Sequence, residues 1–84
     1  MFLHVKRVSH IKEYVLRIEF TDGAIKDVDL RGELQGEVFE PLRDPSFFGR
    51  VKINEETCTV EWPNGADFAP EFLYEHGTDV KQVA

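Results

Sequence analysis

The chain has 84 residues, of which 42% are hydrophobic and 31% charged, and its 16 acidic and 10 basic residues give a formal net charge of −6. A chain of this length forms one domain with a small core, and the composition is typical of a soluble folded domain and not of a disordered one. The negative charge disfavours the counterion release that drives non-specific binding to nucleic acid. We therefore treat residues 1–84 as a single domain with a short polar C-terminal tail from about residue 77.

Cysteine usage and the N-terminal segment indicate the compartment. The single cysteine, Cys58, excludes an intramolecular disulfide and a zinc knuckle built from cysteines, which fits a reducing cytoplasm. Residues 1–10 lack the apolar run of a signal peptide or a spanning helix. We expect a cytoplasmic protein that makes no contact with a membrane.

The first half of the chain predicts a three-stranded antiparallel meander. Leu3 and Val5 indicate a first strand, and the apolar residues of segment 14–20 alternate with the period of a strand that buries one face. The Asp22-Gly23 pair predicts a tight two-residue hairpin turn, because both residues accept positive φ angles. The returning strand covers residues 25–30, where a break in the alternation suggests a bulge or a twist.

The middle of the chain predicts short turns and one helical turn. Two glycines and a proline between residues 32 and 41 interrupt any long helix. Asp44-Pro45 has the pattern of a helix N-cap followed by proline at the first helical position, with Phe47 and Phe48 inside and Gly49 at the end.

A second hairpin is predicted next, with one arm at residues 51–53 and a turn around residues 54–56. Cys58, Val60 and Trp62 alternate along the returning arm, which places Cys58 and Trp62 on the same face. We interpret Cys58 as a small buried apolar residue, because no base stands near it in sequence to activate the thiol.

A joint between this strand and a helix is predicted at residues 62–70. Pro63 cannot donate to a sheet ladder, so the strand ends there or runs along an edge, and Gly65 supplies a turn with positive φ. Asp67 is expected to cap a helix over residues 70–75 that packs its apolar side chains inward and stops near residue 77. The residues assigned to this structural joint are Trp62, Pro63, Gly65 and Pro70.

The chain carries no motif for catalysis or cofactor binding. The three histidines lack metal-ligand spacing, the serines and Cys58 stand in no nucleophile motif, and the glycines are scattered singly. Neighbouring carboxylates such as Asp27 and Asp29 share one face of a strand, and we interpret them as a solvated face. We expect no catalytic residue, no metal, no cofactor and no enzymatic activity.

Several segments of the chain carry one family pattern: Asp22-Gly23, Asp29-Leu30, residues 39–44, Phe48, Val51 and residues 62–67, with Pro70, Leu73 and Tyr74. Together they resemble the bacterial domain-of-unknown-function family 2442 over about residues 8–76. The resemblance implies a small α+β domain of antiparallel strands with short helices, which agrees with two hairpins plus an N-terminal strand. Some members resemble the smaller partner of a toxin–antitoxin pair, and some carry a C-terminal helix-turn-helix, for which the segment after residue 77 is too short.

The first functional hypothesis is a non-enzymatic protein-interaction module, antitoxin-like, that covers a basic protein partner with its more acidic second half. Division after residue 42 places 8 acidic and 6 basic residues in the first half, and 8 acidic and 4 basic residues in the second. Trp62 would hold the scaffold while exposed groups near the joint make the contacts. The candidate contact residues are Asn64, Asp67, Glu71 and Tyr74.

Two alternatives from other classes remain open. A dimeric DNA-binding regulator would contact phosphates through Lys6, Arg7, Lys12 and Arg17, although the net charge makes nucleic acid an unfavoured partner for this chain alone. A small enzyme or ligand-binding domain would hold a pocket near Trp62. A domain this small can also leave an edge strand free and pair through it as a homodimer.

Overall fold

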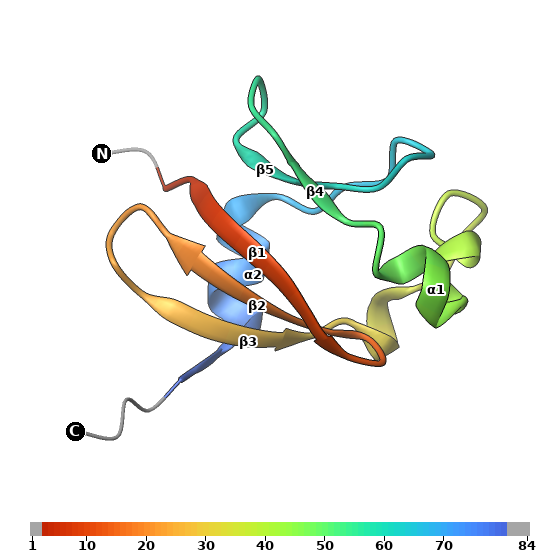
Figure 1. The fold of residues 1–84 in the computed structure, drawn as a ribbon, viewed down its shortest axis with the longest axis horizontal. Coiled ribbons are helices and arrows are strands. Elements are labelled where there is room, and N and C mark those ends of the chain that lie inside the picture. The colour runs from red at the N-terminus through yellow and green to blue at the C-terminus, as the bar shows by residue number, and fades with distance from the viewer. Residues whose placement is uncertain (1–2, 81–84) are drawn as a thin grey trace.

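The computed structural model of the chain describes residues 3–80, which form two antiparallel sheets and short helices (Figure 1). Four strands pair in the order β1-β2-β3-β6, and β4 pairs with β5. This arrangement confirms the α+β class, the meander and the second hairpin. The strands are β1 (Val5–Lys12), β2 (Val15–Phe20), β3 (Ile25–Asp29), β4 (Lys52–Asn54), β5 (Thr59–Glu61) and β6 (Thr78–Asp79). The helices are α1 (Pro45–Phe48) and α2 (Pro70–His76), with 3₁₀ turns η1 (Arg31–Glu33) and η2 (Glu40–Arg43).

Strand β2 is the central element of the larger sheet. Leu16, Ile18 and Phe20 are fully buried, whereas Arg17 between them is exposed. This is the period of two that the sequence predicts for a strand with one face on the core. Helix α2 lies behind this sheet in Figure 1 and contacts β3, so the core fills the space between sheet and helix. No helix within residues 3–80 has the length and apolarity needed to cross a membrane.

The turn between β2 and β3 differs from the predicted two-residue type. Phe20 N donates to Ala24 O at 2.9 Å and Gly23 N donates to Phe20 O at 3.0 Å, which closes a three-residue loop. Only Gly23 takes a positive φ, at 92°, while the Asp22 carboxylate accepts the Ala24 N–H at 2.9 Å. The prediction was wrong because Asp22 caps the turn with its side chain and does not adopt the left-handed backbone.

The same turn recurs at the predicted joint. Trp62 N donates to Ala66 O and Gly65 N donates to Trp62 O, both at 2.9 Å. Gly65 has φ 88°, and the Asn64 side-chain oxygen accepts the Ala66 N–H at 3.2 Å. Residues 20–24 (FTDGA) and 62–66 (WPNGA) thus share one pattern: an aromatic residue, any residue, Asp or Asn, glycine and alanine.

Irregular pairing lies on β1 and not on β3. Strands β2 and β3 pair without interruption from Val15↔Asp29 to Glu19↔Ile25, so the suggested bulge after residue 25 is absent. The register of β1 against β2 shifts between residues 5 and 7 and again between residues 10 and 12. Such bulges twist an edge strand and discourage its pairing with other chains.

The helical turn at Asp44-Pro45 forms as predicted. The Asp44 carboxylate accepts the Ser46 N–H at 3.0 Å, Pro45 opens α1, and Gly49 follows its last residue. Phe48 is fully buried. The backbone carbonyl of Phe48 in this helix accepts a hydrogen bond from the Trp62 side chain of the joint.

Cys58 lies in the turn between β4 and β5, because β5 begins only at Thr59. Its backbone is left-handed, with φ 59°, and its side chain is half-buried. Cys58 therefore does not share a strand face with Trp62, and its interpretation as a buried apolar residue is wrong. Strand β5 is shorter than the alternation suggested, because residues 55–58 form a turn. The Asn54 side chain caps this turn by accepting the Glu56 N–H at 2.8 Å.

The C-terminal part contains one strand more than predicted. Helix α2 starts at Pro70 as expected, but its N-cap Ala69 makes no side-chain hydrogen bond, and Asp67 does not cap it. Beyond Gly77, the expected tail contains β6, which pairs with β3, and Val80 N donates to Ile25 O at 2.9 Å. A side chain at Gly77 would lie 2.9 Å from Lys26 Cβ, so this crossing needs glycine. Residues 81–84 of the tail lie outside the described residues.

Candidate interaction surface

Trp62 is the structural anchor of the joint. Its side chain is 1% exposed, and the indole Nε1–H donates to Phe48 O at 2.7 Å. Its rings pack against Phe48 at 5.4 Å and Phe68 at 5.9 Å between centroids. Trp62 thereby ties α1 to the segment that leads into α2, and it is not available to line an open pocket.

Asn64 is exposed, but both ends of its amide are bound within the chain. Nδ2 donates to Val38 O at 2.8 Å while Oδ1 accepts the Ala66 N–H. The side chain therefore joins the Pro63–Gly65 turn to the loop before η2. This geometry gives Asn64 a positioning role for the loop that carries Val38.

Asp67 stands opposite Glu61 in an isolated antiparallel bridge, and Glu61 stands opposite Lys52 in the β4–β5 ladder. Opposed residues on antiparallel segments share a face, so Asp67, Glu61 and Lys52 belong to one face of this small sheet. Asp67 is exposed and Glu61 half-buried.

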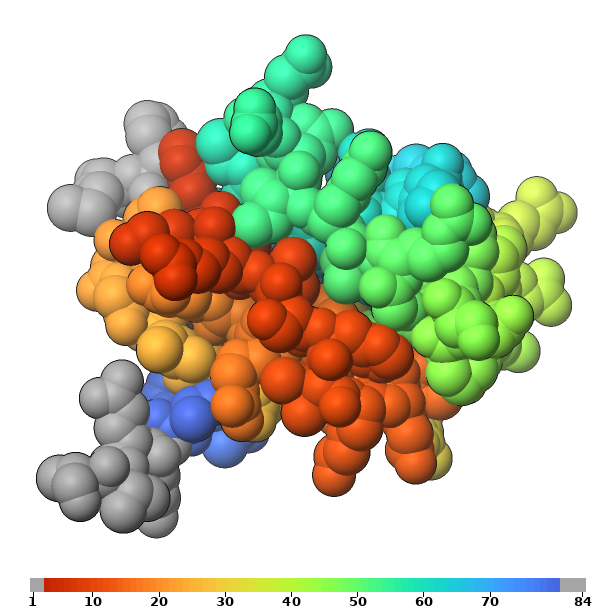
Figure 2. Space-filling model, in the orientation of Figure 1, coloured from red at the N-terminus to blue at the C-terminus, as the bar shows by residue number. Residues whose placement is uncertain are grey.

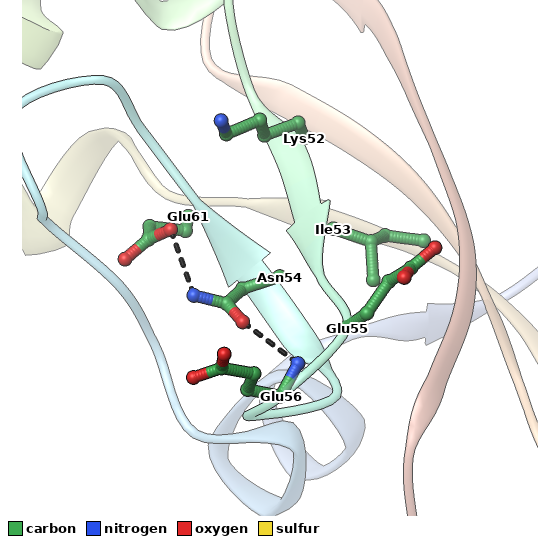
Figure 3. Close-up of a pocket in the computed structure, with 6 residues that line it drawn as sticks. All are labelled: Lys52, Ile53, Asn54, Glu55, Glu56 and Glu61. Atoms are coloured by element: carbon green, nitrogen blue, oxygen red, sulfur yellow. Dashed lines mark hydrogen bonds between the residues drawn. The ribbon is translucent and has the colours of Figure 1, made fainter.

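An open hollow lies on the same hairpin (Figure 3). Asn54 Nδ2 donates to Glu61 Oε2 at 3.0 Å, and these side chains lie with Lys52 and Glu56 on one side of the hairpin, whereas Ile53 and Glu55 point to the other. No three His, Cys, Asp or Glu side chains within residues 3–80 come together as a metal site. The hollow is polar and acidic, and the tip of this hairpin projects from the molecule in Figure 2.

Glu71 and Tyr74 both belong to α2, but they differ in surroundings. Glu71 is exposed, while Tyr74 is half-buried and donates its hydroxyl to Asp22 Oδ2 at 2.7 Å. This hydrogen bond lowers the pKa of Asp22 and raises the pKa of Tyr74. The Tyr74 ring also packs edge-on against Phe20 at 5.0 Å and lies under Lys26 Nζ at 4.1 Å. Tyr74 thus joins α2 to the β2–β3 turn.

The basic residues that could meet phosphates are largely engaged with carboxylates. Lys6 and Arg7 both approach Glu19, at 3.6 and 3.8 Å. Arg17 donates to both oxygens of Asp27, at 2.8 and 3.1 Å, and this hydrogen bonding lowers the pKa of Asp27 and raises that of Arg17. The exposed face of the sheet carries alternating charge, so nothing here favours the regulator alternative.

An aromatic ladder, made of Phe39, Phe68, Phe72 and His76, is the feature that sequence reasoning missed. Successive ring centroids are 5.0, 5.5 and 5.1 Å apart, and the last two pairs are stacked. The spacing of four between residues 72 and 76 was a visible signal of one face of α2, whereas Phe68 precedes the helix. Phe39 joins the ladder only through the tertiary fold.

The comparisons with known proteins identify the family. The model of the family described as "Protein of unknown function (DUF2442)" matches residues 5–79, which run from the start of β1 to the end of β6. No curated protein and no solved structure matches the chain. The family match covers most of the sequence and confirms the resemblance found in the sequence. The chain belongs to the DUF2442 family.

Proposed function

We propose that the protein is a non-enzymatic interaction module, antitoxin-like, whose acidic second half covers a basic surface of another protein. The observation that carries this proposal is the distribution of ion pairs. The five ion pairs within residues 3–80 all hold acids of the first half or Asp79. The second-half acids that form no ion pair in the described part of the chain are Asp44, Glu55, Glu56, Glu61, Asp67, Glu71 and Glu75.

Uncompensated carboxylates on one part of a surface create a field that attracts a basic partner and repels an acidic one. In the first half, 8 acids stand against 6 bases, and ion pairs engage Glu13, Glu19 and Asp27. In the second half, 8 acids stand against 4 bases, and within the described residues Asp79 alone is paired, with Lys26 of the first half at 3.5 Å. The second half therefore presents the larger excess of negative charge, from the hairpin, from Asp67 and from α2. Among the four candidate contacts, Asp67 and Glu71 fit such recognition, while Asn64 and Tyr74 position the backbone.

The test is a tagged pull-down from lysate of the source organism, run with and without nuclease and at low and high salt. The proposal expects a protein that resists nuclease, has a basic isoelectric point and, once purified, forms a complex of fixed stoichiometry. Its affinity should fall as salt screens the charges.

Two results would overturn the proposal. Recovery of nucleic acid in place of protein would move the chain to the regulator class. A purified partner whose affinity is indifferent both to salt and to Glu71→Lys would show that the acidic surface is not what binds.

A further inference from the structure

The aromatic ladder forms a partly exposed apolar strip along α2. Phe39, Phe68 and Phe72 are half-buried, and His76 at one end is exposed. At the other end, Val38 is 44% exposed, one of two large apolar side chains that are this open within the described residues. Because successive rings are in contact, the strip is continuous from the loop before η2 to the last residue of α2.

Carboxylates flank the strip at both ends. Glu71 and Glu75 are four residues apart, so on a helix of about 3.6 residues per turn they form a row next to the row of Phe72 and His76. Both are exposed and form no ion pair within residues 3–80. Around Phe39, the neighbouring Glu37 and Glu40 are likewise exposed and unpaired in the described part.

Cations of the chain lie over three other half-buried aromatic rings. Lys26 lies over Tyr74 at 4.1 Å, Arg31 over Tyr14 at 5.4 Å and Arg50 over Phe47 at 5.9 Å. Within residues 3–80, no cation of the chain lies over a ring of the ladder. Phe72 is stacked between Phe68 and His76, so the rings with an outer face that no other ladder ring covers are the two end rings, Phe39 and His76, each of which lies near unpaired carboxylates.

From this combination we infer that the aromatic ladder with its flanking glutamates is a docking face for an arginine-bearing segment of another protein. The inference deepens the proposed function and rests on it. The planar guanidinium of arginine stacks on aromatic faces and binds carboxylates through two parallel hydrogen bonds. Apolar residues of the same segment would cover the remaining ring surface. Lysine, a compact and strongly hydrated charge, fits the stacked rings less well.

Two other occupants are disfavoured by charge. A second copy of the chain, docked symmetrically through this face, would bring the Glu71 and Glu75 rows of both copies together. A membrane surface with anionic headgroups would repel the same carboxylates. A basic segment is the occupant that relieves the local negative charge.

The probe for this face is a short synthetic peptide that alternates Arg and Leu, titrated into the ¹⁵N-labelled full chain and followed by NMR. The proposal expects the largest amide shifts in residues 68–76 and 37–40. A lysine version of the peptide should bind more weakly, and a version with Ser in place of Leu weaker still.

Matched variants locate the contact. Phe72→Leu, which keeps an apolar side chain but removes the ring stacked between Phe68 and His76, should weaken binding of the arginine peptide by about fivefold. Phe47→Leu, at a half-buried phenylalanine of α1, is its control and should leave the affinity within about twofold. The charges are tested with two double variants. The first changes both Glu71 and Glu75 to Lys on α2. The second changes both Glu55 and Glu56 to Lys on the hairpin tip, which alters the net charge by the same amount.

The outcomes separate this inference from the proposed function. Equal losses for the two double variants, or shifts spread over the hairpin, would overturn the docking face while leaving an acidic interaction module standing. Capture of a basic protein from lysate, together with no binding of the peptide, would also overturn the docking face and leave the interaction module standing. Shifts confined to the ladder, with loss in Phe72→Leu and in Glu71→Lys with Glu75→Lys, support the docking face even if lysate capture fails.

Discussion

Replacing Trp62 with phenylalanine tests how the joint is held. The indole Nε1–H donates to Phe48 O at 2.7 Å in a buried position, so the variant leaves that carbonyl without this donor. The loss of a buried partner costs about 1–3 kcal/mol. The smaller ring also leaves a cavity of roughly 40 Å³, which adds about 1 kcal/mol at ~24 cal/mol per Å³.

Together these effects lower the free energy of unfolding by about 2–4 kcal/mol, out of the ~4–12 kcal/mol that a domain of this size has in total. Urea denaturation followed by far-UV circular dichroism measures the change, because the variant lacks tryptophan fluorescence. At a slope of ~1.5 kcal/mol per M the midpoint falls by on the order of 2 M. Phe47→Leu, which removes no hydrogen bond, is the control. A loss below about 1 kcal/mol for Trp62→Phe would refute the anchoring role.

Three further predictions concern other parts of the fold. Gly77→Ala should lower the free energy of unfolding by about 1–3 kcal/mol in urea denaturation, because the added Cβ would lie 2.9 and 3.0 Å from side chains of β3. Gly32→Ala is the control and should leave stability unchanged, because its Cβ would meet nothing within 4 Å. Tyr74→Phe should flatten the pH dependence of stability. The lowered pKa of Asp22 gives stability that is lost as pH falls below about 4. The raised pKa of Tyr74 gives stability that is lost as pH rises beyond about 10. An unchanged profile at both ends would show that this hydrogen bond does not form in solution. Cys58→Gly should raise the thermal midpoint modestly, since it relieves a left-handed φ of 59°, and a lower midpoint would count against that reasoning.

Local sequence patterns predicted the helices and strands that depend on contacts between residues close in sequence. The alternation in segment 14–20 matches β2, and Asp44-Pro45 starts α1 with the expected cap. The turn at Asp22-Gly23 was placed correctly but given the wrong loop length, since the sequence does not show which residue takes the positive φ. Asp67 was misassigned as a helix cap because its pairing with Glu61 depends on the tertiary fold.

Features made by long-range contact were not predicted. Strand β6 has two exposed polar residues and no strand pattern, and it forms because Gly77 lets the chain pass close to β3. The aromatic ladder depends on Phe39, which is far from Phe68 in sequence. Of the candidate contacts, the sequence could indicate that Asn64 favours a turn, but not that its amide would bind Val38 O. The acidic residues near the joint are visible in the sequence, but only the structure shows that no basic side chain within the described residues pairs with them.

Hydrogen–deuterium exchange of the protein alone and in complex with the partner captured from lysate tests the central claim most directly. The account predicts that binding slows exchange in residues 68–76 and 37–40, around the ladder and its glutamates. It also predicts little change in β1 and β2, whose exposed basic side chains pair with Glu19 and Asp27. Protection confined to β1 and β2, with none at α2, would contradict the proposal that the acidic aromatic face is where the partner binds.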